Sequence, residues 1–283
     1  MFRRRVNTMF ATRISKRSSA VVTGAGSGIG RAFAVELAAR QGRVVCADIR
    51  RESARETAAL IEAQGGKALA VECDVASLEA AQRLAEESEQ WLGRPVDLVV
   101  NNAGVGAGGL PIGEVSIEDW RWTVGVNLWG VVHGCHVFAP RLRALGRGGI
   151  INVCSAASFA AAPMMGPYNV TKAAVLALSE TLRAELDGTG VRVSALCPTF
   201  VKTDIVSNGH IPAATSKLAS KLMAWTGVTP EAVVKTTLEA LDADRLYVLP
   251  QLDARIIWRM KRLAPEAYNR GTAMVVRAFG PRS

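Results

Sequence analysis

The sequence has little of what marks secreted, metal-binding or membrane-spanning proteins. Its five cysteines show no paired spacing and several fall in expected buried strands, so we interpret them as reduced core residues. Among only three histidines, His133 and His136 have no third ligand nearby, and we expect no metal site. No apolar run reaches the roughly 18 to 20 residues of a membrane span, and residues 1–19 lack the apolar centre of a secretory signal. We therefore expect a cytoplasmic protein.

Acidic residues are almost absent from the two ends of the chain. Residues 1–17 carry six basic residues and no acidic one, and residues 253–283 carry seven basic and two acidic residues. The whole chain has a formal charge of +9, so the body between the ends is close to −2. Because a nucleic-acid-binding domain carries its positive charge on the folded body, we expect no nucleic-acid partner.

Strand and helix signals alternate from residue 19 onward, beginning around a glycine-rich turn. Residues 20–23 are typical of a strand, residues 24–30 (GAGSGIG) of a turn, and residues 31–40 of a helix. Glycines let the backbone approach a pyrophosphate, whose charge is met by N–H groups at the helix start. A tight turn without a ligand is the alternative, but the position between a strand and a helix favours a dinucleotide site.

The next strand, residues 43–47, ends at Asp48. A carboxylate about 20 residues beyond the turn can hydrogen-bond the adenosine ribose hydroxyls and repel a 2′-phosphate, which favours NAD over NADP. Arg50 and Arg51 could receive such a phosphate, but we interpret them as solvent-facing residues at a helix start. Further along, Asp74 could contact the adenine or cap the helix that begins near Ser77, and both interpretations can hold together.

Alternating strands and helices predict an α/β fold: a single-domain, doubly wound parallel sheet of the Rossmann type, with a C-terminal helical extension. We expect a disordered basic arm at residues 1–17, a dinucleotide-binding catalytic domain at residues 18–250 and a basic helical extension at residues 251–283. The arm is interpreted as dispensable; an organellar targeting segment and a true start at Met9 are the alternatives. Residues 101–104 (NNAG) follow a strand at the edge where a ligand binds such a sheet.

Three residues of the central stretch can carry chemistry. A buried strand at residues 150–154 ends at Ser155, and Tyr168 and Lys172 lie four residues apart on one helical face. A neighbouring cation lowers the pKa of a phenol from its usual value of about 10, which makes Tyr168 a candidate general acid/base. Ser155 could donate a hydrogen bond to a substrate oxygen. A surface tyrosine beside a solvated lysine is the alternative.

Taken together, these motifs closely resemble the short-chain dehydrogenase/reductase family over about residues 18–250. The resemblance implies a seven-stranded sheet, a homodimer or homotetramer, and an NAD(P)-dependent oxidoreductase. It implies that Ser155 polarises the substrate oxygen, Tyr168 exchanges the proton and Lys172 grips the nicotinamide ribose and depresses the tyrosine pKa. Asn127, a polar residue in a mostly helical segment at residues 120–145, would hold a water on the proton path. Many members have Pro-Gly where this chain has Pro198-Thr199, and threonine disfavours the positive φ that glycine allows.

The motifs and the resemblance together assign a set of residues to the cofactor. These are Gly24, Ser27, Gly28, Ile29, Gly30, Asp48, Asp74, Val75, Asn101, Ala103, Gly104, Tyr168, Lys172, Pro198, Val201 and Thr203.

The expected pocket is mostly apolar, which favours a lipophilic secondary alcohol or ketone, steroid-like compounds being one example. Its expected lining is Phe159, Pro163, Met164, Met165 and Phe200, with residues 205–226 as a lid. The alternatives are an NADPH-dependent ketoacyl or carbonyl reductase and a non-catalytic dinucleotide-binding regulator. The C-terminal helix, with Arg255, Arg259 and Arg262 on one face and Ile256, Met260 and Leu263 on the adjacent one, could cover the active site, pack in an oligomer or contact a membrane.

Overall fold

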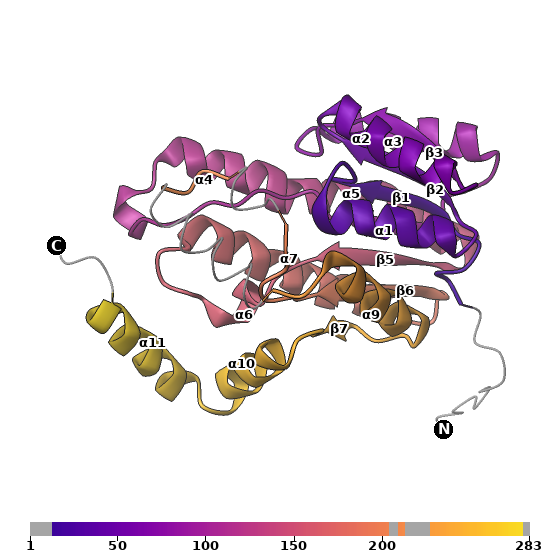
Figure 1. The fold of residues 1–283 in the computed structure, drawn as a ribbon. Helices are drawn as coiled ribbons and strands as arrows, with labels where there is room; N and C mark the ends of the chain where they lie inside the picture. The colour runs from indigo at the N-terminus through magenta and orange to yellow at the C-terminus, as the bar shows by residue number, and fades with distance from the viewer. Residues whose placement is uncertain (1–12, 204–208, 213–226, 280–283) are drawn as a thin grey trace, which may run out of the picture.

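Seven parallel strands lie in one sheet, so that the carboxyl ends of all the strands meet at the same edge. The structure is a computed structural model that describes residues 13–203, 209–212 and 227–279, with side chains up to residue 274. The strand order is β3-β2-β1-β4-β5-β6-β7, with every pairing parallel (Figure 1). The expected Rossmann-type α/β class and its C-terminal helical extension are confirmed.

The strands are β1 (Ser19–Thr23), β2 (Arg43–Asp48), β3 (Lys67–Glu72), β4 (Leu98–Asn101), β5 (Gly148–Val153), β6 (Val191–Leu196) and β7 (Tyr247–Val248). The helices are α1 (Gly28–Ala39), α2 (Arg51–Ala63), α3 (Leu78–Leu92), η1 (Ile112–Glu114), α4 (Ile117–Val124), η2 (Gly125–Trp129), α5 (Gly130–Leu145), α6 (Ala157–Ala160), α7 (Gly166–Glu185), α9 (Pro230–Asp242), α10 (Leu252–Leu263) and α11 (Pro265–Phe279).

Apolar residues fill both faces of the sheet, because strands between two helical layers have no solvent side. Successive residues of a strand point to opposite faces. Val21 accordingly packs in a core with Phe138 of α5, whereas Val22 packs in a second core with Phe33 of α1 and Leu238 of α9. Helices α3, α5 and α7 cover the first face, and α1, α2 and α9 cover the second.

The order of the strands reverses between β1 and β4. The chain winds from β1 to β2 and β3 on one side, then crosses back to build β4 to β7 on the other. In an open α/β sheet, the crevice for a ligand forms at this point, outside the carboxyl ends of the strands. Here those ends are Thr23 of β1 and Asn101 of β4, which lead directly into the glycine turn and the NNAG loop.

The segment expected to be mostly helical, residues 120–145, contains a π-helical turn. Helix α4 passes through the π-helical turn η2 into α5. Asn127 lies in η2 and is fully buried. Such π-helical turns add a residue to the helical repeat and occur often at functional sites, so the interruption re-aims this one side chain.

The folded body begins earlier than we expected. Within the arm expected at residues 1–17, Ser15 is buried, and its N–H and hydroxyl both donate to the carboxylate of Asp242, at 3.0 and 2.6 Å. Ile14 packs against the second core. The expectation of disorder is therefore wrong for residues 13–17, because the basic residues around them made a short packed segment hard to recognise. Residues 1–12 lie outside the described residues.

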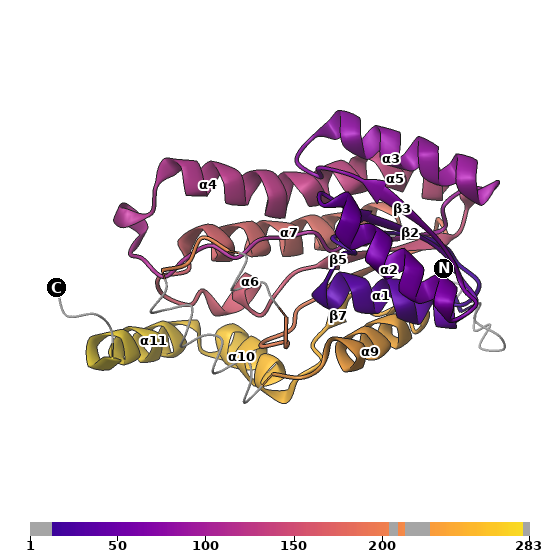
Figure 2. The same cartoon turned by 45° about the horizontal axis from the view of Figure 1, so that its top comes forward.

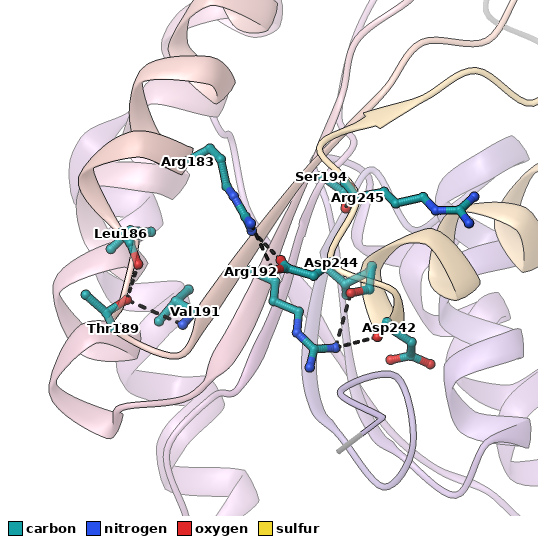
Figure 3. A network of polar contacts seen from close by, with 10 residues as sticks. Arg183, Leu186, Thr189, Val191, Arg192, Ser194, Asp242, Asp244 and Arg245 are labelled. Atoms are coloured by element: carbon teal, nitrogen blue, oxygen red, sulfur yellow. Dashed lines mark hydrogen bonds and ion pairs between the residues drawn. The ribbon is translucent and has the colours of Figure 1, made fainter. Parts of the chain in front are cut away.

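The edge of the sheet opposite the crevice is held by charged side chains around the turn between α9 and β7 (Figure 3). Arg183 of α7 forms a two-pronged ion pair with Asp244. Arg192 of β6 donates to the carbonyl of Asp242 at 2.7 Å, and the Ser194 hydroxyl donates to that of Arg245 at 2.8 Å. These contacts fix the last strand, and thereby the starting point of α10.

Helix α10 lies beside α6, and α11 continues away from the sheet (Figures 1 and 2). The predicted basic residues Arg255, Arg259 and Arg262 are exposed. Two of them also reach neighbouring residues, since Arg262 lies 5.3 Å from the ring centre of Tyr247 and Arg255 donates to the carbonyl of Leu249 at 2.9 Å. The row Ile256, Met260 and Leu263 is exposed. Among the described helices, none has both the length and the apolar character that a membrane crossing requires.

Candidate active site

The glycine turn and the NNAG loop pack directly on one another at the carboxyl edge. A Cβ on Gly24 would lie 2.8 Å from the Cα of Ala103, and one on Gly30 would lie 2.0 Å from the carbonyl oxygen of Gly24. Gly24 also has a φ of +63°. Larger residues therefore cannot occupy these positions without moving the backbone, which explains the glycines at the turn.

Two polar residues that the sequence analysis did not assign to the site hold these loops together. The hydroxyl of Thr23 accepts the N–H groups of Asn102 and Ala103, at 3.0 and 3.1 Å. The side-chain amide of Asn102 donates to the carbonyls of Thr23 and Gly24, at 2.9 and 3.2 Å. Both residues could have been identified from the sequence by their position at the carboxyl ends of adjacent central strands.

The start of α1 has the features of an anion site. Within the described residues, the side chain of its N-cap, Ser27, makes no capping bond, and the first turn holds no acidic residue. The first N–H groups, including those of Gly28, Ile29 and Gly30, have no acceptor inside the helix. Together with the close backbone packing at Gly24 and Gly30, this arrangement fits a pyrophosphate.

Asp48 lies at the end of β2, buried beside the glycine turn. Its carboxylate accepts the N–H of Gly26 at 2.9 Å and that of Arg50 at 3.0 Å, one on each oxygen. Each oxygen keeps a second lone pair, so the carboxylate can also accept ribose hydroxyls. Arg50 and Arg51 are exposed at the start of α2, where we expected them to face solvent.

The side chain of Asn101 turns into the core. Its amide donates to Asn152 at 2.9 Å, and Asn152 donates to Ser179 at 3.0 Å. The Asn101 side chain therefore joins β4 to β5 and α7, and the predicted contact with the cofactor is left to the backbone of the loop.

Asp74 and Val75 follow β3 at the same edge. Asp74 is exposed and accepts the N–H of Ala76 at 2.9 Å, whereas Ser77 caps α3 by accepting the N–H of Ala80 at 3.1 Å. The capping alternative for Asp74 is thus wrong. The carbonyl of Val75 pairs with Nδ1 of His133 at 2.9 Å. His133 therefore has a structural partner, and the described residues contain no cluster of three or more metal-ligating side chains.

Ser155, Tyr168 and Lys172 come together where β5 ends and α7 begins. Ser155 lies close enough to Tyr168 to lower the pKa of its phenol as a hydrogen-bonding neighbour. Lys172 is 2% exposed; its Nζ lies 5.7 Å from the centre of the Tyr168 ring and donates to the carbonyl of Val153 at 2.8 Å. A Cβ on Gly104 would lie 3.5 Å from this Nζ, which places the lysine beside the NNAG loop.

The pKa of Tyr168 differs from our expectation. Burial raises it, because desolvation penalises the phenolate, and the hydrogen bond from Ser155 acts in the opposite direction. Burial also lowers the pKa of Lys172. The predicted lowering of the phenol pKa by the neighbouring Lys172 is therefore not found in this arrangement, in which the ammonium is bonded to the Val153 carbonyl.

Asn127 closes the crevice from the side of η2. Its side-chain oxygen accepts the N–H of Val105 at 2.7 Å, and its amide donates to the carbonyl of Val105 at 2.9 Å. A Cβ on Gly104 would lie 3.2 Å from the same oxygen. The amide predicted to hold a water is thus engaged at both ends by the backbone, and it fixes the loop that follows β4.

The loop after β6 forms the other wall. Pro198 and Val201 are buried, and a Cβ on Gly28 would lie 3.0 Å from the methyl group of Thr203, so this loop faces the glycine turn. Thr199 keeps its backbone outside the left-handed region. The expected apolar rim includes Met164, whose carbonyl accepts the N–H of Gly109 at 2.6 Å, and Phe200, which is exposed. Residues 205–208 and 213–226 of the expected lid lie outside the described residues.

Comparisons with known proteins agree with this geometry. A family model described as short chain dehydrogenase matches residues 18–211. The chain is 38% identical to the 1-deoxy-11-beta-hydroxypentalenate dehydrogenase of Streptomyces exfoliatus, over 87% of this chain and 90% of the relative. It is 37% identical to the D-threitol dehydrogenase of Mycolicibacterium smegmatis, over 68% of this chain and 72% of the relative. A short-chain dehydrogenase/reductase from Burkholderia phymatum, solved with NAD, has a TM-score of 0.85 at 34% identity, over 92% of this chain and 96% of that structure's chain.

Proposed function

This chain belongs to the short-chain dehydrogenase family of oxidoreductases, enzymes that act on hydroxyl or keto groups, and from that premise we propose an NAD-dependent dehydrogenase of lipophilic secondary alcohols. The reverse reaction is reduction of the corresponding ketones. The observation that carries the proposal is the meeting of Ser155, Tyr168 and Lys172 beside a crevice whose glycine turn fits a pyrophosphate.

The chain's own residues handle the proton and the substrate oxygen. A nicotinamide held beside Tyr168 and Lys172 would supply the hydride chemistry, as acceptor in oxidation and as donor in reduction. Ser155 donates a hydrogen bond to the substrate oxygen and holds it near the phenol of Tyr168. Tyr168 takes the hydroxyl proton in oxidation and gives it back in reduction. Lys172, held by the Val153 carbonyl, is placed to bind the nicotinamide ribose.

Asp48 supports NAD rather than NADP. Its carboxylate is buried and anchored by two backbone N–H groups at the end of β2, where the 2′-oxygen of an adenosine ribose would lie. A 2′-phosphate would place a second negative charge against it. The relative solved with NAD agrees with this choice.

The rim supports a lipophilic substrate, because the side chains of Phe159, Met164, Met165 and Phe200 are apolar. The relative from Streptomyces exfoliatus is named for a hydroxypentalenate, whereas the relative from Mycolicibacterium smegmatis is named for the polyol D-threitol. For assembly we propose a homodimer or homotetramer with α10 at a subunit contact, and contact with a membrane surface as the second use of that helix.

The proposal is tested by measuring NADH formation with a panel of hydrophobic secondary alcohols, including steroid alcohols, against sugars and polyols. We expect kcat/KM to be at least tenfold higher for the hydrophobic set, and NADH to bind more tightly than NADPH in a fluorescence titration. A marked preference for polyols would contradict the substrate class, and tighter binding of NADPH would contradict the role of Asp48.

A further inference from the structure

Helix α10 is bonded to the loop that follows β6. The hydroxyl of Thr199 donates to the carboxylate of Asp253 at 3.0 Å, and its N–H donates to the side-chain oxygen of Gln251 at 3.2 Å. The amide of Gln251 then donates to the carbonyl of Phe200 at 3.2 Å. Three hydrogen bonds thus hold two consecutive residues of the loop against the first turn of the C-terminal extension.

The residue before Thr199 reaches the serine turn. The carbonyl of Pro198 accepts the N–H of Ala156 at 2.8 Å. Ala156 follows Ser155 directly, and the Ser155 hydroxyl oxygen accepts the N–H of Ala157 at 3.2 Å. A displacement of the Pro198–Thr199 peptide would therefore be transmitted to Ser155 through one hydrogen bond and one covalent link.

The residues after Thr199 form a wall of the cofactor crevice. Val201 pairs with Val228, and Lys202 donates its N–H to the Val228 carbonyl at 3.1 Å. Thr203 then lies against Gly28 at the start of α1. The same short loop therefore touches the serine turn at one end and the glycine turn at the other.

We propose that Thr199 is a positioning residue through which the C-terminal helix holds the cofactor loop and the serine turn in place. The inference rests on the proposed function, since it assigns this loop to the NAD site. Glycine at this position, as in the Pro-Gly pattern, would offer no hydroxyl to Asp253 and would leave the loop more freedom. The C-terminal extension is thus part of the active-site framework.

The test compares Thr199→Val, which removes the hydroxyl at nearly constant shape, with Thr199→Ser, which keeps it. We expect Thr199→Val to raise the Kd for NADH, and the KM for NAD, by about three- to tenfold, the effect of losing one hydrogen bond. Thr199→Ser should stay within about twofold of the parent protein. Thr236→Val, at an exposed helical threonine that donates to the Ala232 carbonyl at 3.0 Å, controls for the substitution itself.

Unchanged NADH binding by Thr199→Val, or equal weakening by all three variants, would overturn the inference. If Thr199→Val does not fold, Asp253→Ala removes the other partner and should weaken NADH binding similarly. When both single variants fold, the double variant should bind NADH no more weakly than Thr199→Val alone, and additive losses would contradict the coupling. A parent protein that binds no NADH would overturn the proposed function. A parent protein that binds NADH, with variants that behave otherwise than expected, would overturn only the inference about Thr199.

Discussion

The proton-transfer group that we propose is the half-buried phenol of Tyr168. Burial raises the pKa of Tyr168, and the hydrogen bond from Ser155 lowers it. Lys172 is also desolvated, and its Nζ is directed to the carbonyl of Val153. The pKa of the phenol is therefore raised chiefly by burial and lowered by Ser155, and the serine is the contribution that a substitution can remove most simply.

The pH profile of alcohol oxidation follows from these shifts. Oxidation needs Tyr168 as a base, so kcat/KM should rise with pH until the phenol is ionised, whereas ketone reduction should be favoured at lower pH. Because Ser155 lowers the pKa, Ser155→Ala should move the rising limb to higher pH in addition to lowering the rate. Steady-state rates from neutral to alkaline pH measure the limb, and a limb that moves to lower pH would contradict this assignment.

The residue types in the sequence predicted the chemistry of the site, but they did not predict the directions of the side chains. The i, i+4 spacing of Tyr168 and Lys172 correctly placed both on one face of α7. The spacing could not show that burial raises the pKa of the phenol, because desolvation depends on elements far away in the chain. For the same reason the sequence did not separate Asn101, which faces the core, from Asn102, which ties the glycine turn.

At the scale of elements, the crevice is shaped by an irregular helix. The π-helical turn η2 aims Asn127 at Val105, and this pair of hydrogen bonds fixes the loop that follows β4. The alternation of strands and helices was readable from apolar runs and glycine turns. The π-helical turn was not, because residues 120–145 keep helical periodicity while the extra residue is accommodated by tertiary contacts.

Replacing Asn127 by leucine should loosen this loop. Leaving the N–H and the carbonyl of Val105 without partners should lower the free energy of unfolding by about 2 to 6 kcal/mol, at about 1 to 3 kcal/mol for each of the two groups. The activity should fall as well, since Gly104, the residue before Val105, lies beside Lys172. Denaturant titration and kcat/KM measure both effects, with Asn269→Leu on the exposed face of α11 as the control. An Asn127→Leu protein as stable and active as the parent would contradict the role given to η2.

At the scale of the molecule, the positive charge and the exposed apolar residues gather at the C-terminal end. Ile256, Met260 and Leu263 form one exposed row on α10, with Leu263 84% exposed. Arg255, Arg259 and Arg262, which we predicted as a basic face, are exposed beside this row. An exposed apolar row of this kind suits a second protein surface, which is the use that we propose for it.

Introducing negative charges into this row should therefore change the oligomeric state of the protein. The double substitution Met260→Glu and Leu263→Glu should shift the protein to a smaller species in sedimentation velocity while NADH still binds. Leu60→Glu, at an exposed leucine of α2, should leave the sedimentation unchanged. An unchanged oligomer combined with lost binding to anionic vesicles would show that the row serves a membrane instead.

The measurement that tests the central claim most directly is NADH formation from a hydrophobic secondary alcohol by the parent protein and by Tyr168→Phe. Loss of the phenolic hydroxyl should lower kcat by about 10²- to 10⁴-fold, the usual contribution of a positioned general base. The Kd for NADH, measured by fluorescence on the same samples, should stay within about twofold of the parent value, since the ring remains. Equal rates for the two proteins, at equal NADH affinity, would contradict the assignment of Tyr168 as the proton-transfer group.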